Sequence, residues 1–314
     1  MALIWTAILS VIILVYLLQK LLGPEKKKMF PPGPWSLPIV GHFHLLGRNP
    51  HQDLHRLARK YGPIMGLRFG FMPTIIVSSA AGAELFLKTH DLNFASRPES
   101  EAAKHVSYGQ RNLVSAPYSP YWRDMRKLCT LELLSNRRIN QFQAMRRAEL
   151  ELLVSSLKRA AEKSEIVDFS SRISGLSGDM NCLMIFGKKY ADGDLDVKGF
   201  KAVMVEAMEI GASFNLADYF PYIGVLDLHG MNRRMKELSR IFDGFLEKVI
   251  DEHVQNKKAG ENDGTEDFVD TMMSIMESGE AGFEFDRRNV KAVLLVSRLI
   301  TCFNFCLHFF LNVY

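Results

Sequence analysis

The pattern of hydrophobic positions begins with one long apolar run. Residues Ala2 to Leu18 carry no charge and, with Leu21 and Leu22, reach ~20 residues, the length of a helix that spans a bilayer core. A cleaved signal peptide and a buried core helix are the alternatives, but the lysines follow the run, whereas a signal peptide begins with basic residues. The pattern therefore predicts a single transmembrane signal anchor at residues 1–22, with the body of the chain in the cytosol by the positive-inside rule.

Prolines dominate the next segment, which runs from Met29 to Gly47. Each proline fixes its own φ and disfavours helix in the residue before it, so the segment is predicted to be extended and stiff. A ligand for a small recognition module is the alternative, but the position directly after the predicted anchor favours a spacer. We therefore assign residues 23–47 as a proline-rich hinge.

Beyond the hinge, the pattern is mainly that of helices with one apolar face. His51 to Tyr61 places its apolar residues on one face, and Met65 to Ser79 has the pattern of two short strands around a turn. Longer helical patterns follow at Tyr121 to Leu134, Asn136 to Glu162, Ser170 to Phe186, Val197 to Phe214 and Met231 to Asn256. Lys257 to Glu266 is polar and contains glycine, which is typical of a loop. The sequence thus predicts a mainly α fold with a small β hairpin.

Composition and charge narrow the function classes. The 314 residues are 47% hydrophobic and 24% charged, so the chain can bury a large core. The 39 basic residues are spread among 35 acidic ones, which disfavours nucleic-acid binding. The four cysteines have no metal-finger spacing, and a cytosolic location keeps them reduced. We expect Cys129 and Cys182, which fall in helical patterns, to be small buried hydrophobic residues.

Candidate chemistry lies in PYWRDMRKLC, Pro120 to Cys129. In a helix that begins near Tyr121, Trp122 and Arg126 are four residues apart and share a face. An indole donor and a guanidinium that point the same way suit the edge of a planar, anionic cofactor. The alternative is a tryptophan packed in the core beside an exposed arginine.

The order and spacing of several motifs favour the cofactor. After the apolar anchor come PPGP, LRFGFMPTIIVSS, FASRP, WRDMR and FNLADYFPYIGVLDLHG. In this order, from Ala2 to about Val296, the chain resembles the microsomal cytochromes P450 of plants. It is most similar to the group that oxidises secondary metabolites, and somewhat like its biphenyl 4-hydroxylases. The resemblance implies the N-terminal part of the cytochrome P450 fold, with residues 48–296 as an incomplete catalytic domain.

The resemblance also implies an activity and a set of site residues. The family consists of haem-thiolate monooxygenases that receive electrons from NADPH-cytochrome P450 reductase at the endoplasmic reticulum membrane. Its WxxxR residues, here Trp122 and Arg126, donate to a haem propionate. Glu99 to Ala116 corresponds to the loop that closes over the substrate, and Val205 to Asn215 to part of the cavity roof. The implied substrate-binding residues are His105, Val106, Leu113, Val114, Phe214 and Asn215. The implied substrate is a small hydrophobic, aromatic plant metabolite such as a phenolic or a biphenyl.

The sequence departs from the family's pattern after Val296. The residues SRLITCFNFCLHFFLNVY lack the family's acid–Thr pair, and its ExxR and FxxGxRxCxG motifs are missing, so no cysteine can be assigned as the iron ligand. We predict that residues 297–314 are a non-family tail, as translation of a retained intron would give. A second membrane-associated helix and a shifted reading frame are the alternatives.

These differences predict a truncated chain without monooxygenase activity. The expected site contains no catalytic residue and no metal ligand, and stable haem binding is not expected. Two other hypotheses remain: a non-catalytic membrane protein that modulates a cytochrome P450 or its reductase, and a splice product without function.

Overall fold

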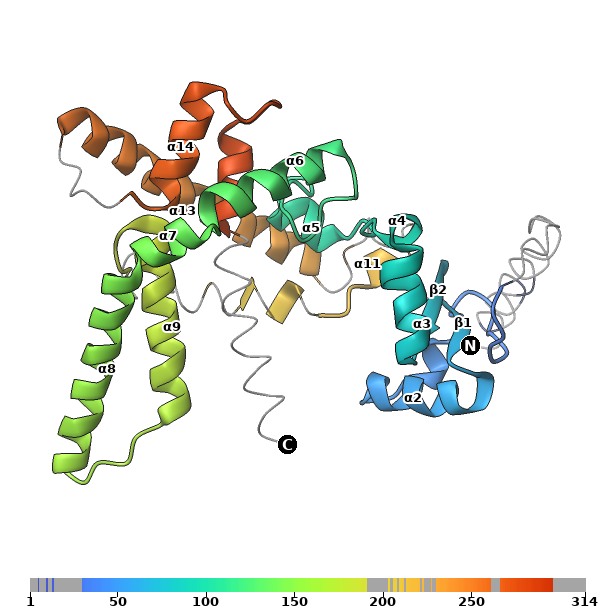
Figure 1. Ribbon diagram of the computed structural model, residues 1–314. Coiled ribbons are helices and arrows are strands. Elements are labelled where there is room, and N and C mark those ends of the chain that lie inside the picture. The colour runs from blue at the N-terminus through green and yellow to red at the C-terminus, as the bar shows by residue number, and fades with distance from the viewer. Residues whose placement is uncertain are drawn as a thin grey trace. The chain divides into compact units, whose positions relative to one another are not determined.

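The computed structural model describes residues 5, 10, 13, 30–190, 203, 206–207, 209–211, 213–220, 222, 227, 230–260 and 266–295 (Figure 1). The predicted anchor, apart from three residues, and the predicted tail lie outside this part of the chain. Within it, no helix is both long enough and apolar enough to cross a membrane. The chain divides into two compact units, Met1–Ala95 with Leu216–Leu226 and Ser96–Asn215 with Asp227–Tyr314.

The first unit places short helices around a two-stranded antiparallel sheet. Its elements are the 3-10 turn η1 (Phe43–Leu45), α2 (Pro50–Tyr61), β1 (Ile64–Phe69), β2 (Met72–Val77), α3 (Ala80–Glu84), the π-helical turn η2 (Leu85–Thr89), α4 (Asp91–Phe94) and α11 (Leu216–Tyr219).

The second unit contains helices and, among its described residues, no strand. Its elements are α5 (Glu101–Val106), α6 (Pro120–Leu128), the π-helical turn η3 (Cys129–Leu133), α7 (Asn136–Gln141), α8 (Gln143–Glu162), α9 (Phe169–Phe186), α13 (Met231–Ala259), α14 (Phe268–Ser278) and a helix at residues 287–295. The predicted mainly α fold with a small β hairpin is therefore confirmed.

The hairpin carries the core of the first unit. Alternate side chains of a strand point to the same face, and in β1 the buried ones are Met65, Leu67 and Phe69. They pack with apolar residues of η1, α2 and α11. Phe69 pairs with Met72 across a two-residue turn, where Gly70 has a φ of +57°, a conformation that costs glycine little. The turn of the predicted hairpin thus lies at Gly70.

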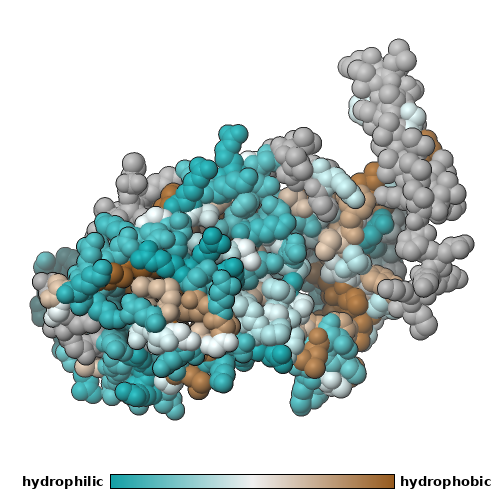
Figure 2. Space-filling model, turned by 90° about the horizontal axis from the view of Figure 1, so that it is seen from above, coloured by the Kyte–Doolittle hydropathy of each residue, from teal (hydrophilic) through white to brown (hydrophobic). Residues whose placement is uncertain are grey.

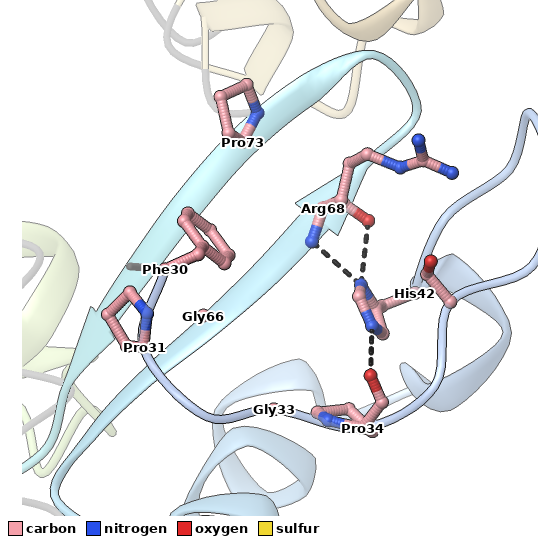
Figure 3. A pocket seen from close by; sticks show the side chains of 9 residues that line it. Phe30, Pro31, Gly33, Pro34, His42, Gly66, Arg68 and Pro73 are labelled. Atoms are coloured by element: carbon pink, nitrogen blue, oxygen red, sulfur yellow. Dashed lines mark hydrogen bonds between the residues drawn. The ribbon is translucent and has the colours of Figure 1, made fainter. Parts of the chain in front are cut away.

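The proline-rich segment lies along β1. The Gly66 N–H donates to the Pro32 carbonyl at 3.0 Å. His42 is buried, and its Nδ1 accepts the Arg68 N–H at 2.7 Å while its Nε2 contacts the Pro34 carbonyl at 2.9 Å (Figure 3). The described part of the predicted hinge is thus pinned to the hairpin by backbone contacts and one histidine.

A single long helix organises the core of the second unit. The buried face of α13 comprises Met235, Leu238, Phe242, Phe245, Leu246, Val249 and Ile250, a spacing that follows the helical repeat. Residues of α6, α9, α14 and the helix at 287–295 pack in the same cluster. Cys129 and Cys182 are buried members of this cluster, so the structure confirms them as small core residues.

Apolar side chains also remain at the surface. Trp35, Leu87 and Tyr222 in the first unit are each more than 70% exposed, at 74%, 78% and 84%. Figure 2 shows hydrophobic side chains as separate patches on a mainly hydrophilic face. Exposed large apolar residues that gather into patches are typical of surfaces that contact another molecule.

We expect Gly33→Ala to destabilise the first unit. A Cβ at Gly33 would collide with the carbonyl oxygen of Gly66, which is backbone and cannot turn aside. The free energy of unfolding, measured by chemical denaturation of the purified chain, should fall by about 1–3 kcal/mol, as for overpacking elsewhere. Gly175→Ala in α9 is the matched control, because its Cβ would meet nothing within 4 Å. It should stabilise by about 0.5–1 kcal/mol. A Gly33→Ala variant as stable as the wild type would contradict the docking of this segment.

Candidate functional site

Helix α6 positions the two residues that the sequence singled out. Ser119 caps the helix by accepting the Trp122 N–H at 3.2 Å, and Pro120 occupies the first turn, where no backbone donor is needed. Trp122 and Arg126 share a face as predicted, with the guanidinium carbon 5.2 Å from the centroid of the indole. The pair is a cation–π contact on the outer side of the helix.

The two side chains differ in what they can still bind. The Trp122 Nε1–H donates to the Leu113 carbonyl at 3.0 Å, so this donor is already used. Arg126 is exposed, and its guanidinium makes no ion pair or hydrogen bond with the residues that the structure describes. Arg126 therefore has its donors free for an anionic group such as a carboxylate. A direct contact of Trp122 with such a group stays a prediction.

The segment at residues 99–116 lies next to α6 and is internally ordered. Ser100 caps α5 by accepting the Ala103 N–H at 3.1 Å. The Asn112 side-chain oxygen accepts from the Val114 N–H at 3.0 Å and the Ser115 N–H at 2.8 Å. Such a side-chain turn replaces a backbone turn. The segment is therefore a defined loop beside α6.

A closed ring of hydrogen bonds joins this segment to α6 and to the helix at residues 287–295. Tyr121 donates its hydroxyl to the Arg111 carbonyl at 2.7 Å, and the Arg111 guanidinium donates to the Asn289 Oδ1 at 2.9 Å. Asn289 in turn donates its amide to the Tyr121 oxygen at 3.3 Å. Asp286 lies 3.3 Å from the same guanidinium, and burial raises the pKa of Tyr121 to about 12. Three separate elements thus share one polar network.

The predicted substrate-binding residues fall in two places. Val106 and Leu113 pack partly buried against the core cluster, and Val114 is half exposed. The His105 Nε2 lies 3.7 Å from the Glu101 carboxylate. These four residues all belong to the 99–116 segment, and two of them pack against the core.

The other two predicted substrate-binding residues precede α13. Phe214 is exposed, whereas Asn215 is buried and donates its amide to the Asn232 side chain at 3.4 Å. A substrate role stays a prediction for both residues.

Sequence reasoning missed Arg111, Asn289 and Lys291, which anchor the 99–116 segment. Arg111 and Asn289 are 178 positions apart, so no local pattern links them. Lys291 carries a signal that could have been noticed, because it interrupts the apolar run VKAVLLV and charged residues are seldom placed on a buried face without a partner.

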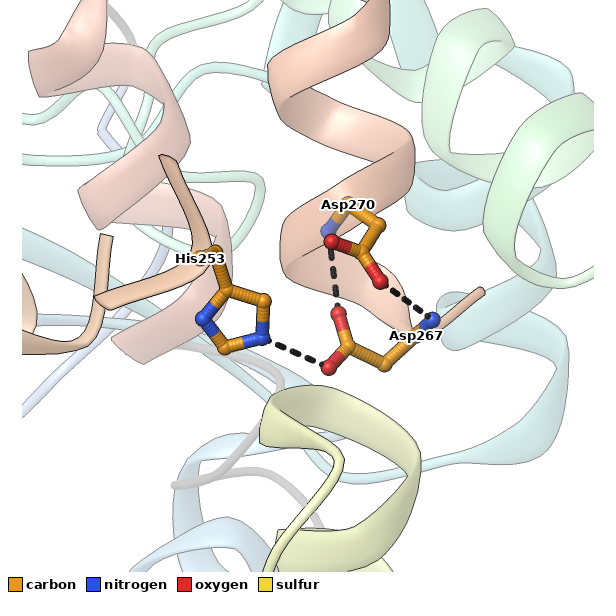
Figure 4. A group of neighbouring side chains, drawn as sticks. All are labelled: His253, Asp267 and Asp270. Carbon is orange, nitrogen blue, oxygen red and sulfur yellow. Dashed lines mark hydrogen bonds and ion pairs between the residues drawn. The ribbon is translucent and has the colours of Figure 1, made fainter. Parts of the chain in front are cut away.

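His253, Asp267 and Asp270 lie close enough together to suggest a metal site (Figure 4). His253, however, uses both ring nitrogens: Nδ1 donates to the Val249 carbonyl and Nε2 to the Asp267 carboxylate, each at 2.8 Å. Because both nitrogens donate, the ring is protonated and offers no lone pair to a metal. The second Asp267 oxygen accepts the Asp270 N–H and caps α14. The trio therefore joins α13 to the start of α14.

The family follows from comparison with known proteins. Residues 31–297 match the family model for cytochrome P450. The chain belongs to the cytochrome P450 family. The predicted resemblance to the plant cytochromes P450 is thereby confirmed.

Several plant cytochromes P450 are similar to this chain. Cytochrome P450 CYP736A12 of Panax ginseng is 42% identical over 281 residues, which are 88% of this chain and 55% of that protein. Flavonoid 3'-monooxygenase CYP75B137 of Crocosmia x crocosmiiflora is 36% identical, over 90% of this chain and 55% of that protein. The 3,9-dihydroxypterocarpan 6A-monooxygenase of Glycine max is 33% identical, over 92% and 57%. The chain thus spans little more than half the length of the relatives it matches.

Haem is the cofactor that the family implies, and the residues present can be tested against it. A haem edge carries propionate groups, which need exposed cationic donors. Arg126 meets this requirement, because its guanidinium is exposed, stacked on Trp122 and not paired within the described part of the chain. The residues of α6 therefore fit the edge of a haem through Arg126, with Trp122 as its support.

We expect the stability of this cytochrome P450 chain to fall as the pH rises through the pKa of His253. Burial disfavours the imidazolium, but the hydrogen bond to Asp267 outweighs it and raises the pKa of His253. A raised folded-state pKa gives stability that is complete below about pH 6.5, the ordinary unfolded value, and is lost above the folded-state pKa. Chemical denaturation across this range should show a loss of roughly 1.5 kcal/mol, the net value of a charged hydrogen bond.

His253→Gln should remove this dependence, since the amide cannot take up the proton. His55→Gln is the control, because His55 is an exposed residue of α2. If His253→Gln and the wild type lose stability in parallel over this pH range, the contact between His253 of α13 and Asp267 at the start of α14 does not depend on a protonated imidazole.

Proposed function

We propose that this cytochrome P450 sequence serves the hydroxylation of a small hydrophobic, aromatic plant secondary metabolite, such as a phenolic or a biphenyl, by a haem-thiolate monooxygenase. Two of the relatives are named as monooxygenases of a flavonoid and of a dihydroxypterocarpan, which favours a substrate of this kind. The apolar side chains of Val106 and Leu113 in the 99–116 segment suit such a ligand.

One observation carries the proposal: Trp122 links the two parts of the site. Its indole N–H holds the Leu113 carbonyl of the 99–116 segment, and its ring supports the Arg126 guanidinium. A residue that binds the cofactor edge and a segment that covers the substrate are thus joined through one side chain. The arrangement supports a site in which Arg126, at the cofactor, and the 99–116 segment, over the substrate, keep a fixed position relative to each other.

The roles of individual residues follow from this geometry. When bound, haem supplies the activation of oxygen that these residues cannot perform themselves. Arg126 would donate its N–H groups to a propionate, and Trp122 would keep that guanidinium in place. Val106 and Leu113 would provide apolar surface and exclude water from the substrate, with His105 and Val114 beside them. Phe214 and Asn215 would contribute to the roof.

We also propose that these 314 residues perform no monooxygenation by themselves. The reaction needs a cysteine thiolate as iron ligand, and none of the four cysteines stands in the FxxGxRxCxG pattern of the family. Burial raises the pKa of the Cys129 thiol to about 12, so this residue stays protonated at neutral pH. The family match extends to residue 297, the first residue of the predicted non-family tail, and no further.

The cellular setting is part of the same proposal. Residues 1–22 would anchor the chain in the endoplasmic reticulum membrane, and residues 23–47 would connect this anchor to a cytosolic body. NADPH-cytochrome P450 reductase would be the electron donor of the complete enzyme. The apolar run at the N-terminus and membership of the family support this setting.

Carbon monoxide binding tests the proposal. The chain, expressed with haem and reduced, should not give the absorption band that names the family, because no thiolate is in position. A chimera that carries a related P450's residues after Val296 should give the band. In that chimera Arg126→Ala should lower haem retention about tenfold or more, because a charged hydrogen bond contributes ~1.5–3 kcal/mol. Arg137→Ala, at an exposed arginine in α7, should leave haem retention unchanged.

Two results would contradict the proposal. A clear band from the 314-residue chain alone would show that it does form a thiolate-ligated haem site. A chimera that binds haem but oxidises only fatty acids, and none of a panel of flavonoids and biphenyls, would exclude the aromatic substrate class.

A further inference from the structure

One lysine of the second unit is buried. Lys291 belongs to the helix at residues 287–295, and its side chain is 6% exposed. Its neighbours Val290 and Ala292 have no exposed surface at all. A lysine is seldom buried to this extent unless each of its donors has a partner.

Lys291 contacts two carboxylates and one aromatic ring. Its Nζ lies 2.5 Å from Asp243 Oδ1 and 2.6 Å from Glu247 Oε1, two carboxylates that are one turn apart on α13. The same Nζ lies over the ring of Tyr108, 5.4 Å from the centroid. Two ion pairs and one cation–π contact thus hold the ammonium between α13 and the 99–116 segment.

The ammonium stays charged and balanced in this place. Burial disfavours the charge, but the hydrogen bonds to Asp243 and Glu247 outweigh it and raise the pKa of Lys291. Glu247 also binds Arg287 at 2.9 Å, and Arg287 binds Asp251 at 2.8 Å. Glu247 has Arg287 as a second cation, and Asp243 is partly exposed to water. Neither carboxylate is therefore left buried without a partner when Lys291 is replaced by a neutral residue.

Tyr108 depends on this contact. Its φ of +52° lies in the left-handed region, which is uncommon for an aromatic residue and has to be held by its surroundings. Its hydroxyl is buried beside the Asp243 carboxylate, although no hydrogen bond of ordinary geometry joins the two groups. The turn after α5 is therefore held at Tyr108 by the ring over Lys291 together with the surroundings of this hydroxyl.

Helix α5, which precedes Tyr108 in the 99–116 segment, also packs on α13. The Ser239 hydroxyl donates to the His105 carbonyl at 2.7 Å, and Val106 packs against the core cluster. The turn itself is closed by the N–H groups of Ser107, Gly109 and Arg111, which donate to carbonyls within the segment at 3.1, 3.2 and 2.9 Å.

We propose that Lys291 is a positioning residue, which fixes the 99–116 segment through the ring of Tyr108 and thereby sets the surface that this segment offers to a substrate. The proposal rests on the proposed function for the substrate, but the placement of the segment is a property of the chain itself. Substitution of Lys291 by a neutral residue should loosen the turn at Tyr108 and leave the core of the second unit intact.

Hydrogen–deuterium exchange of the full-length chain in detergent micelles tests this role. In Lys291→Met, the amides of Ser107, Gly109 and Arg111 should exchange roughly fivefold to thirtyfold faster, the factors that correspond to loss of a cation–π contact of ~1–2 kcal/mol. Tyr108→Leu, which removes the ring, should give the same increase. Lys291→Arg keeps the charge and should stay within about twofold of the wild type. Lys258→Met, at an exposed lysine of α13, is the matched control and should leave the rates unchanged.

Several outcomes would overturn the proposal. Unchanged exchange at these amides in Lys291→Met is one, and an equal increase across α8 and α9 is another, since it would show general destabilisation. Exchange in Lys291→Arg that is as fast as in Lys291→Met would remove the role of the charge. The measurement needs neither haem nor substrate, so its failure would remove the positioning role and leave the proposed function to the carbon monoxide test.

Discussion

The second unit depends on one buried polar side chain, Asn289, that three elements must satisfy together. Asn289 has no exposed surface, and it closes a ring of hydrogen bonds with Arg111 and Tyr121. An unmade bond at such a site costs about 1–3 kcal/mol, because water cannot replace the lost partner. Helix α6, the 99–116 segment and the helix at residues 287–295 therefore cannot separate without a penalty in each of them.

In the proposed site, this constraint links the exposed Arg126 to the 99–116 segment. The ring fixes α6, so that Trp122 reaches the Leu113 carbonyl and Arg126 stays on the open face. Lys291, two residues after Asn289, holds the other end of the same segment through Tyr108. In a cytochrome P450, this places the expected haem edge and the expected substrate cover on a common framework.

The sequence predicted the elements better than the links between them. The pattern at Met231 to Asn256 became α13, because one side of this helix is apolar at the helical repeat. The pattern at Ser170 to Phe186 became α9, whose buried residues lie in its last two turns. The pattern at Asn136 to Glu162 is interrupted at Phe142, whose ring is buried against Phe268, a contact 126 positions away. The spacing placed Trp122 and Arg126 on one face correctly, but it could not show which acceptor the indole meets. Partners that tertiary packing brings together leave no periodic signal.

The coupling between Tyr121 and Asn289 tests most directly whether this ring holds the unit together. In a double-mutant cycle of Tyr121→Phe and Asn289→Ala, with the free energy of unfolding measured by chemical denaturation, the account predicts a coupling of about 1 kcal/mol, as for residues within one hydrogen-bond network. The double variant should then be less destabilised than the sum of the two single variants. Effects that add within ~0.3 kcal/mol, as they do for distant and independent sites, would contradict it.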